Sequence, residues 1–205
     1  MNTNEFDYYF IASAGGVDVP LLECDCDENP SALRFLARDE YAKIEDPVYL
    51  CFNKETTKRL KNPRMVDYHT LPYAVFSQKI FDVLYPMQLE GVQLVPAIIT
   101  GNDGEEYENY YILHTYNPIE CFDKEKSIYK IGAFTKCWAN EKKVYLNREA
   151  LVKIPLEKRL LFVSKETSRF ELYHKSVVDA IMAVNPEGIT FIPVEEWYEG
   201  VQFRQ

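Results

Sequence analysis

"EGITFIPV", at residues 187–194, is the stretch of this sequence that decides the predicted fold. An earlier stretch, "EGVQLVPA" at residues 90–97, aligns with it without a gap at an offset of 97 residues. A glycine at the end of a helix commonly takes a left-handed conformation, and an apolar run after it is typical of a strand. Each stretch therefore predicts the end of a helix followed by a strand.

The residues before each stretch extend the prediction to two related β-α-β units, at about 72–97 and 169–194. The offset of 97 pairs Ile80 with Val177 and Leu84 with Ile181, so both units carry an apolar stripe at helical spacing. Ser77 is expected to cap the first helix through its hydroxyl oxygen. Ser176 and Asp179, before and within the second helix, have the spacing of a capping box.

The rest of the chain predicts further strands at residues 6–12, 47–53, 110–116 and 159–164, and a hairpin around 139–143. We therefore expect an α+β fold with mixed, largely antiparallel sheets and a few short helices. An internal duplication and the convergence of two common patterns both explain the repeat. The chain is accordingly expected to form a single domain over residues 1–205, or two related halves at 1–100 and 101–205.

Pro96 and Pro193 stand at equivalent places inside the two predicted strands. Because proline has no N–H to donate to a neighbouring strand, both strands are expected to lie at sheet edges or to stop at the proline. An edge offers unpaired backbone groups on which another protein can dock. A strand that simply ends at its proline is the alternative interpretation.

The composition bounds the class of protein. The formal net charge is −9, which argues against direct binding to nucleic acid and fits a basic protein partner or an ordinary acidic surface. No apolar run is long enough for a membrane span, and the N-terminus lacks the parts of a signal peptide, so a cytoplasmic location is expected. The odd number of cysteines, five, favours free thiols over a disulfide framework.

The sequence contains no recognised catalytic or phosphate-binding motif. Cys24, Asp25 and Cys26 form the one compact cluster of soft ligands, but zinc sites use a second pair of ligands that is missing here. We expect no cofactor, no metal and no catalysis. A Cys–His or Ser–His–Asp set that assembles from distant positions stays open.

The run "YYILHTYNPIECFDKEKS" at residues 110–127 is similar to a pattern of a bacterial immunity-protein family of polymorphic toxin systems, immunity family eleven. The pattern is Y-x-[IVL]-[LN]-x-x-x-x-[PVI]-[IVL]-[DE]-C-[FL]-D-x-x-x-S. The resemblance continues through "LLFVS" and the ending "LYHKSVVDAIMAVNPEGITFIPV", and covers about residues 71–194. The first seventy residues match only loosely.

The resemblance implies a small cytoplasmic, non-catalytic protein that binds and neutralises a cognate toxin, such as a basic nuclease or a type VI secretion effector. An acidic, tyrosine-rich inhibitor fits a basic substrate groove. Two acidic stretches are the candidate toxin-binding faces, and their residues are Asp103, Glu105, Glu106, Tyr107, Glu108 and Tyr110 in the first, and Glu195, Glu196, Trp197 and Tyr198 in the second. Solvated acidic surface is the alternative for both. The alternative functions are an enzyme that reverses a toxin's modification and an adaptor module of a secretion system.

Overall fold

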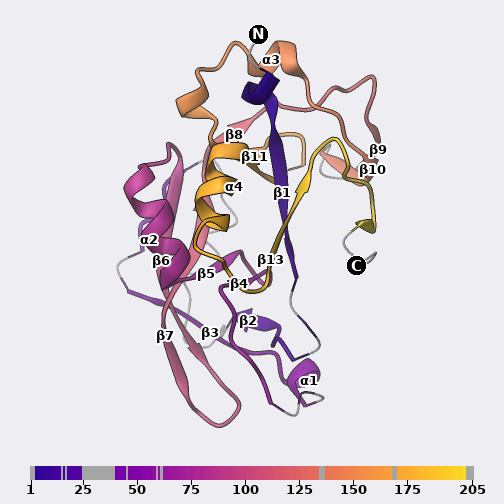
Figure 1. Ribbon diagram of the computed structural model, residues 1–205. Coiled ribbons are helices and arrows are strands. Elements are labelled where there is room, and N and C mark those ends of the chain that lie inside the picture. Colours follow the sequence, from indigo (N-terminus) through magenta and orange to yellow (C-terminus); the bar gives the residue numbers. More distant parts are fainter. Residues whose placement is uncertain are drawn as a thin grey trace.

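The structure is a computed structural model that describes residues 3–201 except 15, 17, 25–39, 45, 59, 61, 134–136 and 168–169 (Figure 1). The helical segments are η1 (Thr3–Phe6), α1 (Lys54–Thr57), α2 (Gln78–Leu84), η3 (Tyr85–Met87), α3 (Arg148–Leu151), η4 (Leu156–Lys158) and α4 (Lys175–Met182). The strands are β1 (Tyr8–Ser13), β2 (Leu22–Cys24), β3 (Val48–Phe52), β4 (Tyr68–His69), β5 (Val75–Ser77), β6 (Val92–Thr100), β7 (Glu106–Thr115), β8 (Pro118–Ile119), β9 (Ile128–Ile131), β10 (Trp138–Lys143), β11 (Leu161–Ser164), β12 (Glu171–His174) and β13 (Ile189–Pro193).

These strands form two large sheets and a ribbon. One sheet has the order β13-β1-β12-β11-β8, the other β2-β3-β6-β7-β5-β4, and β10 and β9 form the ribbon. Pairing is antiparallel except between β11 and β8 and between β3 and β6. The predicted α+β class with mixed, largely antiparallel sheets is therefore confirmed.

The two predicted β-α-β units are present as β5-α2-β6 and β12-α4-β13. In each unit the two strands run parallel but do not touch, because one antiparallel strand lies between them. That strand is β7 in the first unit and β1 in the second. The orders β6-β7-β5-β4 and β13-β1-β12-β11 are thus equivalent, although β7 follows its unit in sequence and β1 comes from the N-terminus.

Helices α2 and α4 contact each other, and both stand in front of strands in the view of Figure 1. The apolar stripes that the sequence predicts face this contact, since Ile80, Leu84, Val177 and Ile181 are buried in one cluster. Both sheets contribute to the same cluster, including Phe76 of β5 and Tyr173 of β12. The division into halves at 1–100 and 101–205 stays a prediction, and strands from both ranges share the five-stranded sheet.

The two Glu–Gly turns each pack on a segment outside their own unit. Gly188 (φ 77°) lies against Val66, so closely that a Cβ atom there would come within 2.8 Å of a Val66 methyl carbon. Gly91 (φ 67°) lies in the same way against Asn117. Glycine is needed at both places, because the conformation is left-handed and the space for a side chain is already filled.

The glutamates of these turns make equivalent ion pairs. Glu187 pairs with Arg64 ahead of β4, and Glu90 pairs with Lys158 ahead of β11 at 3.6 Å. All four side chains are more than half exposed, so each pair contributes little to stability. The two pairs are equivalent in position, because each joins the Glu–Gly turn of one unit to the segment ahead of a strand that lies beside the other unit.

Helix capping differs from the prediction in both units. Ser77 precedes α2 but makes no side-chain cap, because its hydroxyl donates instead to Asp67 Oδ1 at 2.6 Å. In α4 the capping residue is His174, whose Nδ1 accepts from the Ser176 N–H at 3.2 Å. The predicted capping box over Ser176 and Asp179 is therefore wrong, since the helix begins at Lys175 and Ser176 is already its second residue.

The two prolines differ in whether their strands lie at a sheet edge. Pro193 ends β13, which is an edge strand as predicted. For Pro96 the edge prediction is wrong: β6 lies between β3 and β7 and continues past Pro96 to Thr100. β3 pairs with β6 only from Ala97 onward. Pro96 therefore lies before the part of β6 whose backbone N–H groups face strands on both sides.

The predicted hairpin around 139–143 is also wrong. These residues lie within the single strand β10, whose partner is β9. The turn-like polar centre of the sequence is instead an irregularity, where the register shifts between Ala139 and Lys143 and Asn140 takes a positive φ of 52°. A bulge of this kind accommodates extra residues without reversing the chain.

A buried arginine anchors the N-terminal end of β1. Arg159 is fully buried, and its guanidinium donates to the Tyr8 hydroxyl at 2.6 Å and to a carboxylate oxygen of Glu5 at 2.5 Å. Its Nε donates to the Ile154 carbonyl at 2.9 Å. The cation is thus compensated by an opposite charge and hydrogen bonds, as a buried charge requires.

Two further findings bear on the predictions. None of the helices in the described part of the chain combines the length and apolar character that a membrane crossing needs. The cluster Cys24-Asp25-Cys26 falls largely outside the described residues. Cys24, Cys51, Cys121 and Cys137 are not joined in disulfides.

Candidate functional site

The first predicted face lies at the turn between β6 and β7, which projects from the lower end of the molecule (Figure 1). Asp103 Oδ1 accepts from the Glu105 N–H at 3.0 Å, and the Gly101 N–H donates to the Glu105 carbonyl at 2.8 Å. These bonds fix the turn. Glu106 and Glu108 follow on β7 with exposed side chains, so the carboxylates of this face point into solvent.

The two tyrosines of this face are bound to the protein itself. Tyr107 stacks on Phe52 with ring centroids 5.8 Å apart, and its hydroxyl donates to Glu105 at 2.9 Å. Tyr110 is partly buried; its hydroxyl donates to the Val66 carbonyl at 3.2 Å, and burial raises its pKa to about 12. Neither ring is fully exposed, and the role of both as aromatic anchors stays a prediction.

The second predicted face, the tail at 195–198, lies against β10 and the core. Trp197 packs edge-on against Phe170, with centroids 5.0 Å apart, and is partly buried. Tyr198 forms an isolated bridge with Lys143. Glu195 pairs with Arg148 at 2.7 Å, and Glu196 is exposed. The two predicted faces lie at separate places in Figure 1, so the structure does not bring them together.

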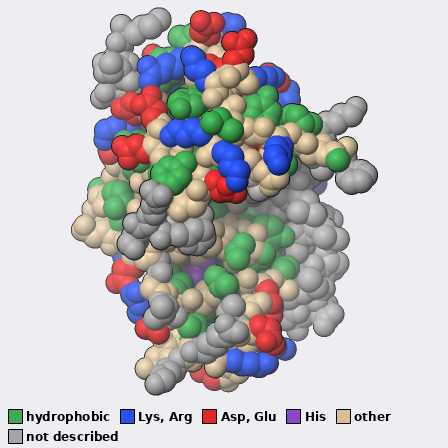
Figure 2. Space-filling view, turned by 90° about the vertical axis from the view of Figure 1, so that its right-hand side faces the viewer, with side chains coloured by type: hydrophobic (Ala, Val, Ile, Leu, Met, Phe, Trp, Pro, Cys, Tyr) green, Lys and Arg blue, Asp and Glu red, His purple; other side chains and the backbone are tan. Residues whose placement is uncertain are grey.

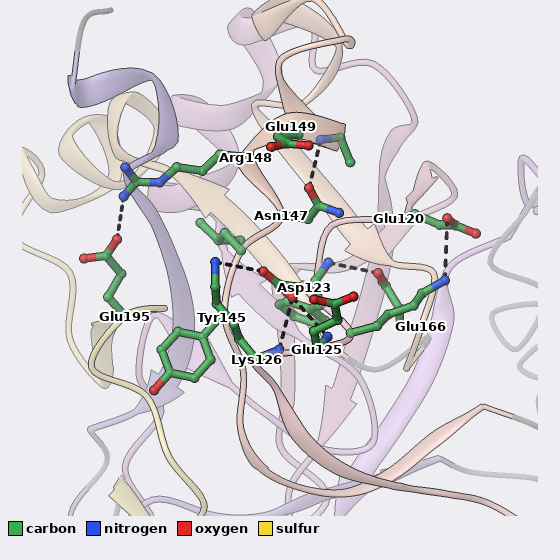
Figure 3. A pocket seen from close by; sticks show the side chains of 14 residues that line it. Glu120, Asp123, Glu125, Lys126, Tyr145, Asn147, Arg148, Glu149, Glu166 and Glu195 are labelled. Carbon is green, nitrogen blue, oxygen red and sulfur yellow. Dashed lines mark hydrogen bonds and ion pairs between the residues drawn. The ribbon is translucent and has the colours of Figure 1, made fainter.

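Glu195 also lines a cavity of about 970 Å³ that the sequence did not predict (Figure 3). It lies between the turn after β8 and the start of α3. Its lining residues are Glu120, Phe122, Asp123, Lys124, Glu125, Lys126, Tyr145, Leu146, Asn147, Arg148, Glu149, Ala150, Glu166 and Glu195. Six of these carry carboxylates and three carry cations, so the walls are charged and predominantly acidic.

One wall is the turn at residues 123–127. Asp123 Oδ1 accepts from the N–H groups of Glu125 and Lys126 at 3.0 and 3.1 Å, and Ser127 Oγ accepts from the Tyr145 N–H at 3.0 Å. The backbone N–H and then the ammonium of Lys126 hold the pKa of Asp123 below its usual value. The Asp of the family-like pattern thus lines the cavity, and its Ser holds the lining residue Tyr145.

The floor contains a buried carboxylate. Glu166 Oε1 accepts from the backbone N–H groups of Cys121 and Phe122, both at 2.9 Å, and Oε2 accepts from the Ser164 hydroxyl at 3.1 Å. Burial and then the charge of Glu166 raise the pKa of the Cys121 thiol. A thiol held in its neutral form is a poor nucleophile, so this cysteine has a structural role.

The opposite wall is the first turn of α3. Asn147 caps the helix by accepting from the Ala150 N–H at 3.0 Å, and its own N–H donates to the Cys121 carbonyl at 2.8 Å. This places Arg148 and Glu149 at the mouth (Figure 3). Sequence reasoning missed both, because their nearness to the 120–127 turn depends on a contact between distant loops. The signal for the wall itself was present in "ECFDKEKS" and was interpreted as structural.

The three histidines have separate environments. His69 Nδ1 lies 3.2 Å from the Pro20 carbonyl, His114 Nε2 lies 2.9 Å from the Glu40 carbonyl, and His174 caps α4. Among the described residues, no three His, Cys, Asp or Glu side chains are grouped as ligands for a metal ion. The charged cavity is therefore suited to recognition of a charged partner through ion pairs and hydrogen bonds.

Comparison with known proteins gives one result. The sequence model of a family described as Immunity protein family (Imm11) matches residues 21–196 of the 205 in the chain. The matched range contains both β-α-β units, the turn between β6 and β7, and all the residues that line the cavity. It includes Glu195 and Glu196 but ends before Trp197. No curated protein sequence matches this chain.

Proposed function

The chain belongs to the Imm11 immunity protein family, and from this premise we propose that it neutralises a cognate bacterial toxin by binding it one to one. The single observation that carries the proposal is the family match over residues 21–196. In this mechanism the protein covers the toxin's active surface and performs no chemistry. It acts in the cytoplasm, where a toxin delivered by a type VI secretion system or a related route would be met.

The residues of the cavity support a binding role rather than catalysis. Cys121 is buried and its pKa is raised, and Glu166 is occupied by hydrogen bonds to backbone and hydroxyl groups. Asp123 is engaged by two backbone N–H groups of its own turn. These groups hold the loops in place.

The charge of the protein supports a basic toxin, with a nuclease as the favoured kind. A formal charge of −9 complements a positively charged substrate groove and accelerates encounter with it. The exposed carboxylates at the turn between β6 and β7 contribute to this attraction. The tail residues 195–198, beside β10 and the cavity, are proposed as part of the contact itself.

The test is co-expression with the toxin encoded by the neighbouring gene. The protein is expected to rescue growth, and the purified pair is expected to form a one-to-one complex with toxin activity falling linearly to zero at equimolar inhibitor. Full protection by a small fraction of an equivalent would instead show an enzyme that reverses the toxin's modification. Binding without rescue would show an adaptor, and either result would overturn the proposal.

A further inference from the structure

We propose that the outer edge of β9, continuous with the acidic cavity, is the docking surface for an extended, basic segment of the toxin. This inference rests on the proposed function and adds the part of the protein that binds and the chemistry of the segment that it takes. The segment pairs with β9 as an added strand. Its apolar side chains lie against Ile128 and Ile131, and a lysine or arginine beyond Ile128 reaches the carboxylates of the cavity.

The first support is the state of the ribbon. β9 pairs with β10 on one side, and no strand pairs with its other side among the residues that the structure describes. The far edge of β10 is already occupied, because Lys143 bridges to Tyr198 and the Trp138 N–H donates to the Glu166 carbonyl at 2.9 Å. The outer edge of β9 is therefore the side of the ribbon open to a new strand.

The second support is the apolar character of this edge. Ile128 and Ile131 are both 58% exposed, and because side chains alternate along a strand they lie on opposite faces of β9. The ribbon is nonetheless held firmly, since the ring of Tyr129 stacks on that of Trp138 with centroids 3.5 Å apart. A rigid strand with unpaired backbone groups and exposed apolar side chains is the kind of surface that accepts an extended peptide.

The third support is charge complementarity. Ser127 joins β9 directly to the acidic wall of the cavity, and the exposed ring of Tyr145 stands beside it. Glu125 and Glu149 have no ion-pair partner among the described residues, whereas Glu195 is paired with Arg148. Two carboxylates without an ion pair in the lining of one cavity attract a cation, so the segment is expected to be basic at the end that passes Ile128.

Lys130 limits where this cation can lie. Its side chain is exposed on β9 between the two isoleucines, and it would repel a basic residue placed directly opposite. Lys126 at the Ser127 end is paired with Asp123 at 3.1 Å, so the cation is expected to lie toward that end of the strand, near the carboxylates of the cavity. β9 and β10 stand at the right of Figure 1, on the face shown in Figure 2, where hydrophobic and charged side chains are intermingled in the upper half.

The experiment measures binding to the toxin domain encoded by the neighbouring gene. The double variant Ile128→Asp/Ile131→Asp is expected to weaken affinity at least tenfold, mainly through faster dissociation, because it removes apolar contacts and sets carboxylates against the apolar side chains of the segment. Glu125→Gln/Glu149→Gln is expected to weaken affinity severalfold and to reduce its salt dependence. In the wild-type complex, amide hydrogen exchange at residues 128–131 is expected to slow.

Matched controls separate these effects from general ones. Tyr85→Asp replaces an apolar side chain that is 68% exposed on η3, and Asp46→Asn/Glu157→Gln removes two exposed charges elsewhere. Both are expected to bind as wild type does. Circular dichroism and thermal unfolding of each variant confirm that the fold is retained, so a loss of binding reports on the surface.

The outcomes are distinct. If the wild-type protein neither binds nor rescues, the proposed function fails and the docking surface fails with it. If the wild-type protein binds but the isoleucine variant binds equally well, or residues 128–131 gain no protection, the docking surface alone is wrong. If light scattering shows that the wild-type protein is a dimer and the isoleucine variant a monomer, the occupant of this edge is a second copy of the chain. That result also overturns the proposal.

Discussion

At the scale of single residues, His69 is a buried base with one of its two ring nitrogens in a hydrogen bond. Only 3% of its surface is exposed; Nδ1 faces the Pro20 carbonyl, and Nε2 has no hydrogen-bond partner. This arrangement requires the neutral ring with its proton on Nδ1. Burial accordingly lowers the pKa of His69 to about 4.

This lowered pKa predicts a loss of stability in mild acid. The unfolded chain takes up a proton on His69 near pH 6.5 and the folded protein only near pH 4, so the free energy of unfolding falls as pH drops through this window. The loss from this group is about 2 kcal/mol between pH 7 and pH 5. His69→Asn keeps a donor for the Pro20 carbonyl but cannot titrate there. Urea unfolding at several pH values should show the variant losing less stability than the wild type; parallel curves would contradict the prediction.

Gly188 gives a second prediction at this scale. Gly188→Ala forces a side chain into the left-handed region and against Val66, and it should lower the free energy of unfolding by about 2–5 kcal/mol. Gly104→Ala is the matched control, because Gly104 also has a positive φ, 83°, but nothing lies within 4 Å of the added carbon. Its cost should be only about 1–2 kcal/mol. Equal losses in thermal or urea unfolding would show that contact with Val66 does not matter.

At the scale of elements, the packing of α2 on α4 joins the two β-α-β units. Ile181→Ala removes a fully buried side chain from this contact and should cost about 2–5 kcal/mol of unfolding free energy. Met182→Ala, at the next position of α4 with 43% exposure, should change it by about 0.5 kcal/mol or less. Chemical denaturation of both variants checks the difference, and a similar loss for each would argue against a shared core.

The junction of the units also has a polar part. Asp67, ahead of β4, accepts from the Ser77 hydroxyl, from Lys79 at 2.8 Å and from the Glu187 N–H at 2.7 Å. Burial alone would raise the pKa of Asp67, but these hydrogen bonds hold it below its usual value. One carboxylate thus ties the start of α2 to the turn between α4 and β13. Its contribution to stability is present above the unfolded pKa and is lost as pH falls through the lowered one.

At the scale of the whole molecule, the acidic net charge is expected to control the rate at which the protein associates with its toxin. Glu105→Gln/Glu106→Gln/Glu108→Gln neutralises the projecting turn between β6 and β7 without touching the core. It should slow association severalfold at low salt, leave dissociation nearly unchanged and weaken the dependence of the rate on salt. Stopped-flow or surface-binding kinetics measure this.

A control variant of equal charge, Asp46→Asn/Glu55→Gln/Glu157→Gln, shows whether the position of the charges matters or only the net charge. An unchanged association rate for the first variant would exclude a role of the turn in attracting the toxin.

The sequence by itself determined the local structure. Apolar residues at helical spacing, a glycine and an apolar run identified both β-α-β units, because each of these signals acts within a few residues of the chain. The α+β class also rested on the strands predicted at 6–12, 47–53, 110–116 and 159–164, and the family resemblance began from the run at 110–127. Two local signals gave wrong predictions. The Ser77 hydroxyl binds Asp67 instead of capping α2. Pro96 is tolerated in a central strand because the pairing with β3 begins after it.

Only the tertiary structure decided how the units are completed and where a partner can bind. β1 enters the second sheet from the far end of the chain to take the place that β7 takes in the first. The cavity joins the turn at 120–127 to α3, Glu166 and Glu195, and Trp197 of the acidic tail packs against the core. These contacts join residues far apart in the sequence, and their energy comes from burial and hydrogen bonds that exist only after the sheets have assembled, so no local pattern encodes them.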